Sequence, residues 1–237
     1  MTADFESLLH ALAAGAGQHL FTVNDWAARL GDSAEARAFL AQLRIEWQPI
    51  DIPDAFCWEL MDYGRNSLTW HVGWPHLWAH TLRVTGNAMA LVSEAGVEAD
   101  HAFLLGLFHD LGKLEEISGG DMHETIGARL LTEKVDGHFL RSEATLLATV
   151  IAKKARSNNP YTQVLYDADK LDKIGATGLA RRISVDVHIE NIPHALDVIA
   201  NDLANFPNMH FPTSRALAVS KVAFTRTFLD QIGYGRV

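Results

Sequence analysis

The sequence predicts an all-α fold, and two features of its pattern support this. Apolar residues recur at spacings of three and four along most of the chain, as at Leu104, Leu107, Phe108 and Leu111. Alternation of apolar and polar residues with a period of two, which is typical of a half-buried strand, is almost absent. Glycine, proline and asparagine punctuate the periodic segments. We therefore expect helices joined by short turns.

The predicted helices have boundaries that the sequence indicates. Gly31 is placed to end one helix, and Asp32 followed by Glu35 is typical of the N-terminus of the next. Residues 47–56 contain two prolines and are expected to form a loop. A long helix is expected over residues 75–94. We divide the chain at residue 65, into an N-terminal helical extension (1–65) and a domain that carries the chemistry (66–237).

Composition excludes several classes of protein. With 237 residues and 48% apolar residues, the chain is long enough and apolar enough for a sizeable core. The net charge of −9 argues against a partner that is a nucleic-acid polymer, because such proteins usually carry a basic surface. The longest apolar run, residues 144–152, is too short to span a membrane. Cys57 is the single cysteine, and the N-terminal segment is not typical of a secretion signal, so we expect a cytoplasmic protein.

Histidine and aspartate lie next to apolar helix positions in three segments. His109 and Asp110 end an apolar segment, and neighbouring helix residues project about 100° apart, so at least one of the two must point inward. A buried imidazole or carboxylate is costly unless it is paired or binds a metal. Taken singly, each segment has an ordinary alternative: a helix-terminal pair for His109 and Asp110, a core histidine for His80, and an exposed acidic face for Asp169.

The order of these segments resembles the HD superfamily of metal-dependent phosphohydrolases. That family has the order His, His-Asp, Asp on an all-helical core, and the segments HTLRV, HDLGK and DADKLDKIG match it in turn. The resemblance covers roughly residues 74–183 and implies an HD-domain helical bundle preceded by the N-terminal extension. It also implies that His80, His109, Asp110 and Asp169 hold a metal, with Asp167 as the alternative to Asp169.

The resemblance implies one divalent transition metal. Two nitrogen and two carboxylate ligands suit Mn, Fe, Co, Ni or Zn. Some members of the family bind a second metal with two further histidines. His123 fits the first of these positions, whereas Lys153, on a helix expected over residues 145–154, stands at the second. We therefore expect one tightly bound ion and leave a second ion open.

The implied activity is hydrolysis of a phosphoester in a nucleotide or another small phosphorylated metabolite. Asp110 belongs to the catalytic centre, and His123 and Glu116 are candidates for acid–base catalysis or for positioning water. A phosphate substrate also needs cations, and Lys113 and Lys153 are the candidates for binding it.

Two other functions fit the same ligands. One is an iron-dependent oxidoreductase on the HD scaffold, which would contain iron and consume oxygen. The other is a non-enzymatic sensor module in which the metal is structural. The sequence identifies neither the substrate nor the metal. It also leaves the oligomeric state open, and a homo-oligomer is compatible with it.

Overall fold

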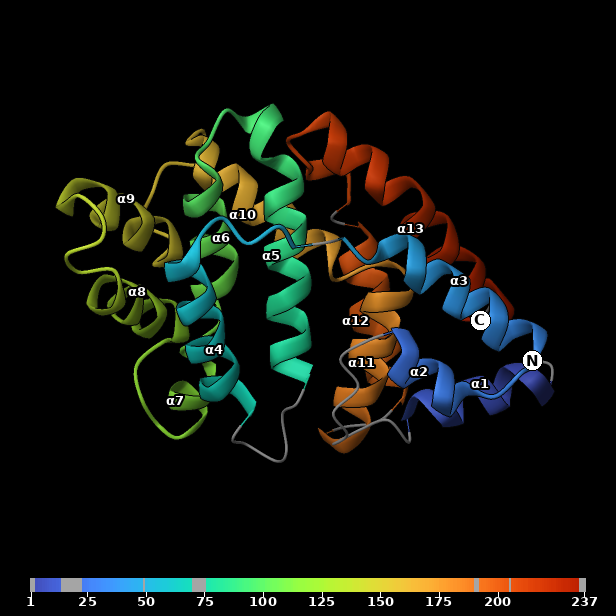
Figure 1. The fold of residues 1–237 in the computed structure, drawn as a ribbon. Helices are drawn as coiled ribbons and strands as arrows, with labels where there is room; N and C mark the ends of the chain where they lie inside the picture. The colour runs from blue at the N-terminus through green and yellow to red at the C-terminus, as the bar shows by residue number, and fades with distance from the viewer. Residues whose placement is uncertain are drawn as a thin grey trace. The chain divides into compact units, whose positions relative to one another are not determined.

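In a computed structural model, the chain is described over residues 3–13, 23–48, 50–69, 76–189, 192–204 and 206–234. These residues form helices joined by turns and contain no strand, so the all-α prediction is confirmed (Figure 1). Backbone contacts divide the chain into two compact units. Unit 1 comprises residues 1–47, 73–79 and 170–237, and unit 2 comprises residues 48–72 and 80–169. The boundary predicted at residue 65 is a different division and stays a prediction.

Unit 1 is built around one central helix. Its described elements are α1 (Ala3–Ala13), α2 (Val23–Leu30), α3 (Ala34–Glu46), α11 (Gly175–Ile189), α12 (Ile192–Ala204), the 3-10 helix η1 (Phe206–Asn208) and α13 (Pro212–Gln231). Helix α11 contacts α1, α3, α12 and α13. It buries Ala176, Leu179, Ala180 and Ile183, which recur at the helical spacing and form the middle of the core.

Unit 2 also has a central helix. It contains α4 (Ala55–Thr69), α6 (Ala99–Phe108), α7 (Lys113–Ile117), α8 (His123–Lys134) and α9 (Arg141–Ile151), together with most of α5 (His76–Ala95) and α10 (Pro160–Leu171). Every residue of α6 from His101 to Phe108 is buried, as in a helix that is covered on all sides. Helices α4, α8 and α9 pack against it.

Two glycines allow close backbone approaches in unit 2. A Cβ atom on Gly106 of α6 would lie 2.5 Å from the Cα of Thr85 on α5, so only glycine allows the two helices to pack this tightly. A Cβ atom on Gly112 would lie 2.4 Å from the carbonyl oxygen of His123. The first contact draws α5 and α6 together, and the second brings the turn after α6 against the start of α8.

Two predicted helix boundaries are wrong by one to three residues. Helix α3 is capped by Ser33, whose hydroxyl accepts a hydrogen bond from the amide of Ala36 at 3.0 Å, whereas Asp32 forms an exposed ion pair with Arg37. Helix α9 ends at Ile151 rather than at residue 154. Serine and aspartate are almost equally good N-caps, so the pattern alone does not choose between neighbours.

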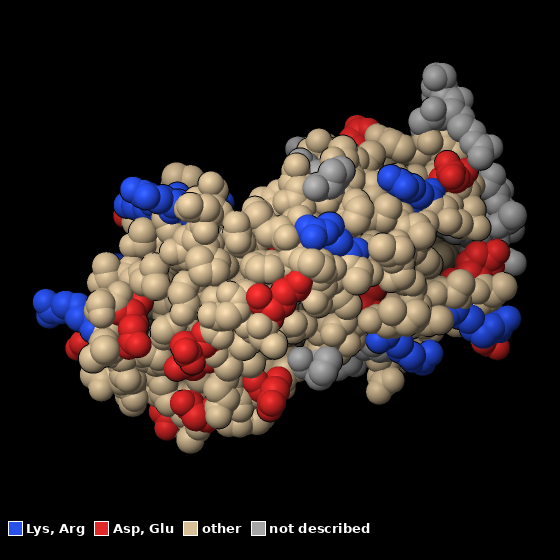
Figure 2. Space-filling model, turned by 90° about the horizontal axis from the view of Figure 1, so that it is seen from above, with Lys and Arg blue, Asp and Glu red and all other residues tan. Residues whose placement is uncertain are grey.

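None of the helices in the described part of the chain combines the length and the apolar character needed to cross a bilayer. Charges of both signs occur on the surface. On the face that Figure 2 draws, Lys and Arg side chains are interspersed with Asp and Glu side chains.

Candidate metal centre

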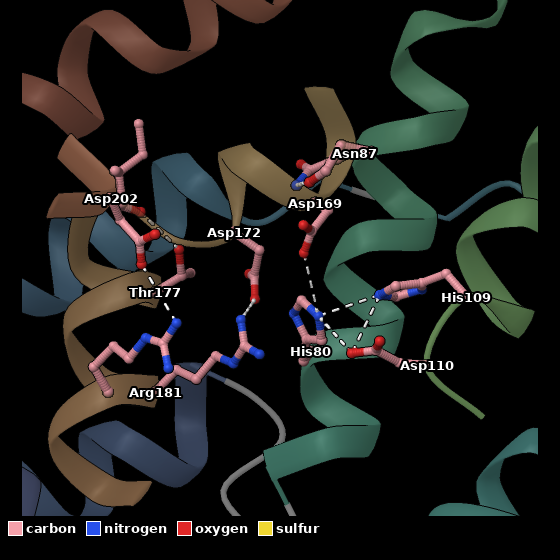
Figure 3. Close-up of polar contacts among 12 residues, drawn as sticks. His80, Asn87, His109, Asp110, Asp169, Asp172, Thr177, Arg181 and Asp202 are labelled. Carbon is pink, nitrogen blue, oxygen red and sulfur yellow. Dashed lines mark hydrogen bonds and ion pairs between the residues drawn. The ribbon is translucent and has the colours of Figure 1, made fainter. Parts of the chain in front are cut away.

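His80, His109 and Asp110 converge on one point in unit 2. His80 comes from the first half of α5, and the other two residues follow the last turn of α6. The Nε2 atoms of the two histidines lie 3.2 Å apart, and Asp110 Oδ2 lies 3.2 Å from His80 Nε2 and 3.4 Å from His109 Nε2. Figure 3 shows the three side chains pointing toward one another. All three are nearly excluded from solvent, with His80 fully buried.

The hydrogen bonding of His109 prepares its Nε2 atom for a metal. Its Nδ1–H donates to the carbonyl oxygen of Gly106 at 2.7 Å, so the neutral imidazole presents a lone pair at Nε2. Nε2 faces His80 Nε2, and the carboxylate of Asp110 offers only acceptors. Two imidazole nitrogens and a carboxylate oxygen thus meet in a buried place, and a cation bound among them would satisfy all three.

The spacing of these three atoms fits a single ion. A tetrahedral ion with bonds of about 2.1 Å holds its ligand atoms about 3.4 Å apart, and an octahedral ion holds them about 3.0 Å apart. The separations of 3.2 to 3.4 Å fall in this range. Nitrogen and carboxylate donors suit a divalent transition metal.

Asp169, on α10, lies at the edge of this group. Its Oδ1 atom is 3.6 Å from His80 Nε2, and its side chain is more exposed than the other three. The adjoining backbone is held in place by Asn87 of α5, whose amide donates to the carbonyl oxygen of Ala168 at 3.1 Å (Figure 3). The structure therefore brings the four predicted ligands into one neighbourhood, three of them closely.

The electrostatic environment shifts the pKa values of His109 and Asp110 in opposite directions. Burial disfavours a charge on His109, but the Asp110 carboxylate outweighs burial and, helped by Asp169, raises the pKa of His109. Burial would raise the pKa of Asp110, yet His109, His80 and Lys113 hold that pKa well below its usual range. The carboxylate thus stays ionised, whereas the imidazole must lose a proton to bind a metal.

Metal affinity is therefore expected to fall as the pH is lowered through the pKa of His109, which is raised above 6.5. The apparent Kd should rise about tenfold per pH unit for each proton that the ion displaces, whereas Asp110 adds no proton in this range. Titration with Mn²⁺ at a series of pH values measures this. Replacing His138 by asparagine is the control, because His138 stacks on Phe56 away from the ligands. A Kd that does not change between about pH 8 and pH 6 would contradict the assignment of His109.

Lys113 and His123 approach the two oxygens of Asp110. The ammonium of Lys113 donates to Oδ2, and His123 Nε2 lies 3.6 Å from Oδ1. Both side chains are partly exposed, so they line the accessible side of the centre. The structure thus places both predicted residues beside the centre.

A second group of metal-binding side chains lies next to His123. Its Nδ1 atom is 2.8 Å from Glu116 Oε2 and 3.3 Å from Glu124 Oε2. The ligand atoms of these three residues all lie within 4.8 Å of one another. Glu115 forms an exposed ion pair with Arg129 instead, which distinguishes it from Glu116. We call Glu116, His123 and Glu124 the second cluster.

Glu124 was not predicted from the sequence. It is only 7% exposed, and it lies on the face of α8 that buries Gly127, Ala128 and Leu131. The spacing of three, four and seven residues from Glu124 to these positions was the available signal. A glutamate on the apolar face of a helix needs a partner.

Lys153 supplies that partner. Its ammonium donates to Glu124 Oε1, although most of the lysine side chain is exposed. Lys153 follows the end of α9 and has a φ of +56°, the only positive value at a non-glycine residue in the described part of the chain. The prediction that Lys153 lies on a helix is therefore wrong: the helix ends at Ile151, and Lys153 lies in the left-handed turn that follows it.

Comparisons with known proteins agree with this architecture. The family model of the HD domain matches residues 77–174, which include all four candidate ligands. The crystal structure of Bacillus subtilis YpgQ in complex with ADP is 20% identical, covers 73% of this chain and 94% of its own, and has a TM-score of 0.58. An HD-superfamily hydrolase from Bacillus thuringiensis is 19% identical, covers 74% and 93%, and has a TM-score of 0.59. No curated protein sequence matches the chain.

At this level of identity the solved structures establish the fold, which is the helical bundle of HD-superfamily hydrolases. The family assignment comes from the matched segment, in which His80, His109 and Asp110 meet. The chain therefore carries a segment, residues 77–174, that matches the HD domain.

Proposed function

We propose that the chain is a metal-dependent phosphohydrolase that cleaves a phosphoester in a nucleotide or another small phosphorylated metabolite. The observation that carries the proposal is the convergence of His80, His109 and Asp110 within 3.4 Å of one another in an HD domain. Asp169 is the fourth proposed ligand, because its carboxylate approaches His80. One divalent transition metal fits this set of donors.

A nucleotide is the favoured substrate class. The similar protein YpgQ has been crystallised in complex with ADP, which supports a nucleotide for a site on this fold. The charges around the centre support a phosphate, since the partly exposed Lys113 and the exposed Lys153 present ammonium groups beside the two clusters. We assign both lysines to binding the phosphate oxygens.

Each residue around the proposed metal site has its own role in the reaction. When bound, the ion supplies a lowered pKa for a water molecule and offsets charge on a phosphoryl oxygen. Glu116 accepts a hydrogen bond from the Nδ1–H of His123. The Nε2 atom of His123 then carries a lone pair and lies toward Asp110. His123 can then take the proton of the attacking water as the new P–O bond forms, and return it to the departing ester oxygen. Lys113 holds Asp110 in place and neutralises phosphate charge.

Assays over a panel of nucleoside phosphates and sugar phosphates test this proposal. The protein is first stripped with a chelator, and Mn, Fe, Co, Ni or Zn is then restored singly before released phosphate or pyrophosphate is measured. We expect turnover of at least one phosphoester with a restored metal and none with the stripped protein. The absence of turnover with every metal and substrate class would overturn the proposal.

Two measurements on the same preparations separate the alternatives. An iron-dependent oxidoreductase would retain iron and consume oxygen during turnover, which a hydrolase does not. A sensor module with a structural metal would lose its fold on chelation, and circular dichroism of the stripped protein detects that loss. We expect no oxygen uptake and a retained helical spectrum.

A further inference from the structure

Unit 1 contains a cavity between helices α1, α3 and α13. Helix α3 packs against both α1 and α13, and Figure 1 shows α3 and α13 side by side. The cavity has a volume of about 250 Å³. Its apolar walls are formed by Leu8 of α1, Ala34 and Ala38 of α3, and Phe224 and Phe228 of α13. A cavity of about 150 Å³ can hold one benzene ring, so this one has room for a ring with a short chain.

Packing behind the cavity holds its walls in place. Leu8 is 3% exposed and Phe228 is 2% exposed, and both belong to the core of unit 1. The ring of Phe224 meets the ring of the buried Phe39 edge-on, with the two centroids 5.8 Å apart. The cavity is therefore shaped by side chains that the core of unit 1 fixes.

One carboxylate that lines the cavity lacks a partner. Among the described residues that form its walls, Glu35 alone carries a charge. The Oε2 atom of Glu35 is buried and makes no hydrogen bond to the described part of the chain. Arg37, the nearest cation along the sequence, pairs with Asp32 at 2.8 Å instead. Since buried carboxylate oxygens are nearly always paired, a hydrogen-bond donor is missing at this place.

The position of Glu35 favours a donor that carries a positive charge. Glu35 lies in the first turn of α3, where the helix dipole stabilises a negative charge. The terminal bond of a glutamate side chain rotates with little preference, so a carboxylate oxygen can turn toward a donor in the cavity. A hydrogen bond between an ammonium group and a carboxylate is roughly twice as strong as one between neutral groups.

We propose that this cavity binds a small primary amine with an aromatic or branched apolar body, whose ammonium group donates to Glu35 while the body packs against Phe224 and Phe228. The volume lies below the range of about 300–1,000 Å³ that is typical of pockets for drug-sized molecules, so the ligand is smaller than these. Every residue that lines the cavity belongs to unit 1, whereas His80, His109 and Asp110 belong to unit 2. The inference therefore goes beyond the proposed hydrolysis.

Titration of the full chain with 2-phenylethylamine, followed by NMR, tests the proposal. The probe for comparison is 2-phenylethanol, which has the same ring and chain but no charge. We expect the amine to bind at one site per chain, with a Kd at least about tenfold lower than that of the alcohol, because only the amine offers a charged donor to Glu35. An amine that does not bind, or that binds no more tightly than the alcohol, would overturn the proposal.

Three variants locate the bound amine. Glu35→Gln keeps the length of the side chain and removes its charge, so the Kd of the amine should rise about tenfold or more while that of the alcohol stays the same. Ala38→Leu places a larger side chain in the cavity and should weaken the binding of both probes. Glu59→Gln, at an exposed position of unit 2, is the matched control and should bind both probes as the wild type does.

Thermal unfolding of each variant shows that it is folded before it is titrated. An unchanged affinity for the amine in folded Glu35→Gln or folded Ala38→Leu would show that the amine binds elsewhere and would overturn the proposal. Because the readout is binding of the amine, its outcome is separate from that of the phosphoester assays.

Discussion

Replacing Asp110 by asparagine is expected to remove the metal from the protein and to abolish hydrolysis. Asp110 Oδ2 lies 3.2 and 3.4 Å from the two histidine Nε2 atoms, so its carboxylate supplies the negative charge at the point where the three ligands meet. Metal affinity should fall by a factor of about 100 or more. Loss of several kcal/mol of electrostatic stabilisation corresponds to a rate lower by about a thousandfold.

This loss should occur without loss of the fold. Asparagine has the shape of aspartate, so the variant leaves no cavity around a residue that is 4% exposed. Metal content after desalting, turnover with restored metal and thermal unfolding are measured on the same preparation. Asp136→Asn, at an exposed position of unit 2, is the matched control and should behave as the wild type. An Asp110→Asn protein that keeps its metal or its turnover would show that the centre lies elsewhere.

Local patterns predicted the helices because helix formation depends on nearby residues, whereas the set of four candidate ligands came from the resemblance to the HD family. The spacing of apolar residues produced the helices, and His109 with Asp110 followed from an apolar segment that ends in polar residues. The sequence order could not give the distances. Those depend on the close approach of α5 and α6 at Gly106 and on the contact of Gly112 with the start of α8, which pair residues far apart in the chain.

Glu124 was not predicted from the sequence, and Lys153 was predicted as a phosphate-binding residue but was placed on a helix. The burial of Glu124 depends on which face of α8 packs into unit 2, and a glutamate next to a histidine is ordinarily solvent-exposed. Lys153 was expected on a helix because the apolar pattern before it is helical. The chain instead turns after Ile151 in a conformation typical of glycine, and no propensity argument places lysine there. The contact between Lys153 and Glu124 could therefore be identified only from the structure.

The other large expected effect concerns Glu46, at the end of α3 in unit 1. Its carboxylate is 3% exposed and accepts hydrogen bonds from the amides of Ala176 and Thr177 at 2.7 and 2.9 Å, at the N-terminus of α11. It also pairs with the buried ammonium of Lys221 at 3.0 Å. Replacing Glu46 by alanine leaves that ammonium and two amides without their acceptor, so the free energy of unfolding should fall by about 3–5 kcal/mol. Urea unfolding followed by circular dichroism measures the change.

The double variant Glu46→Leu with Lys221→Met is the control for this interpretation. Removing both charges leaves no buried ion unpaired, so the double variant should be more stable than Glu46→Leu or Lys221→Met alone. A double-mutant cycle over these variants measures the difference in the free energy of unfolding. Losses that simply add would contradict the pairing. Glu46 is surrounded by donors from its own chain, whereas Asp110 and Glu124 face further acceptors and a single lysine each. That difference is why Glu46 is expected to control stability, and Asp110 the binding of a metal.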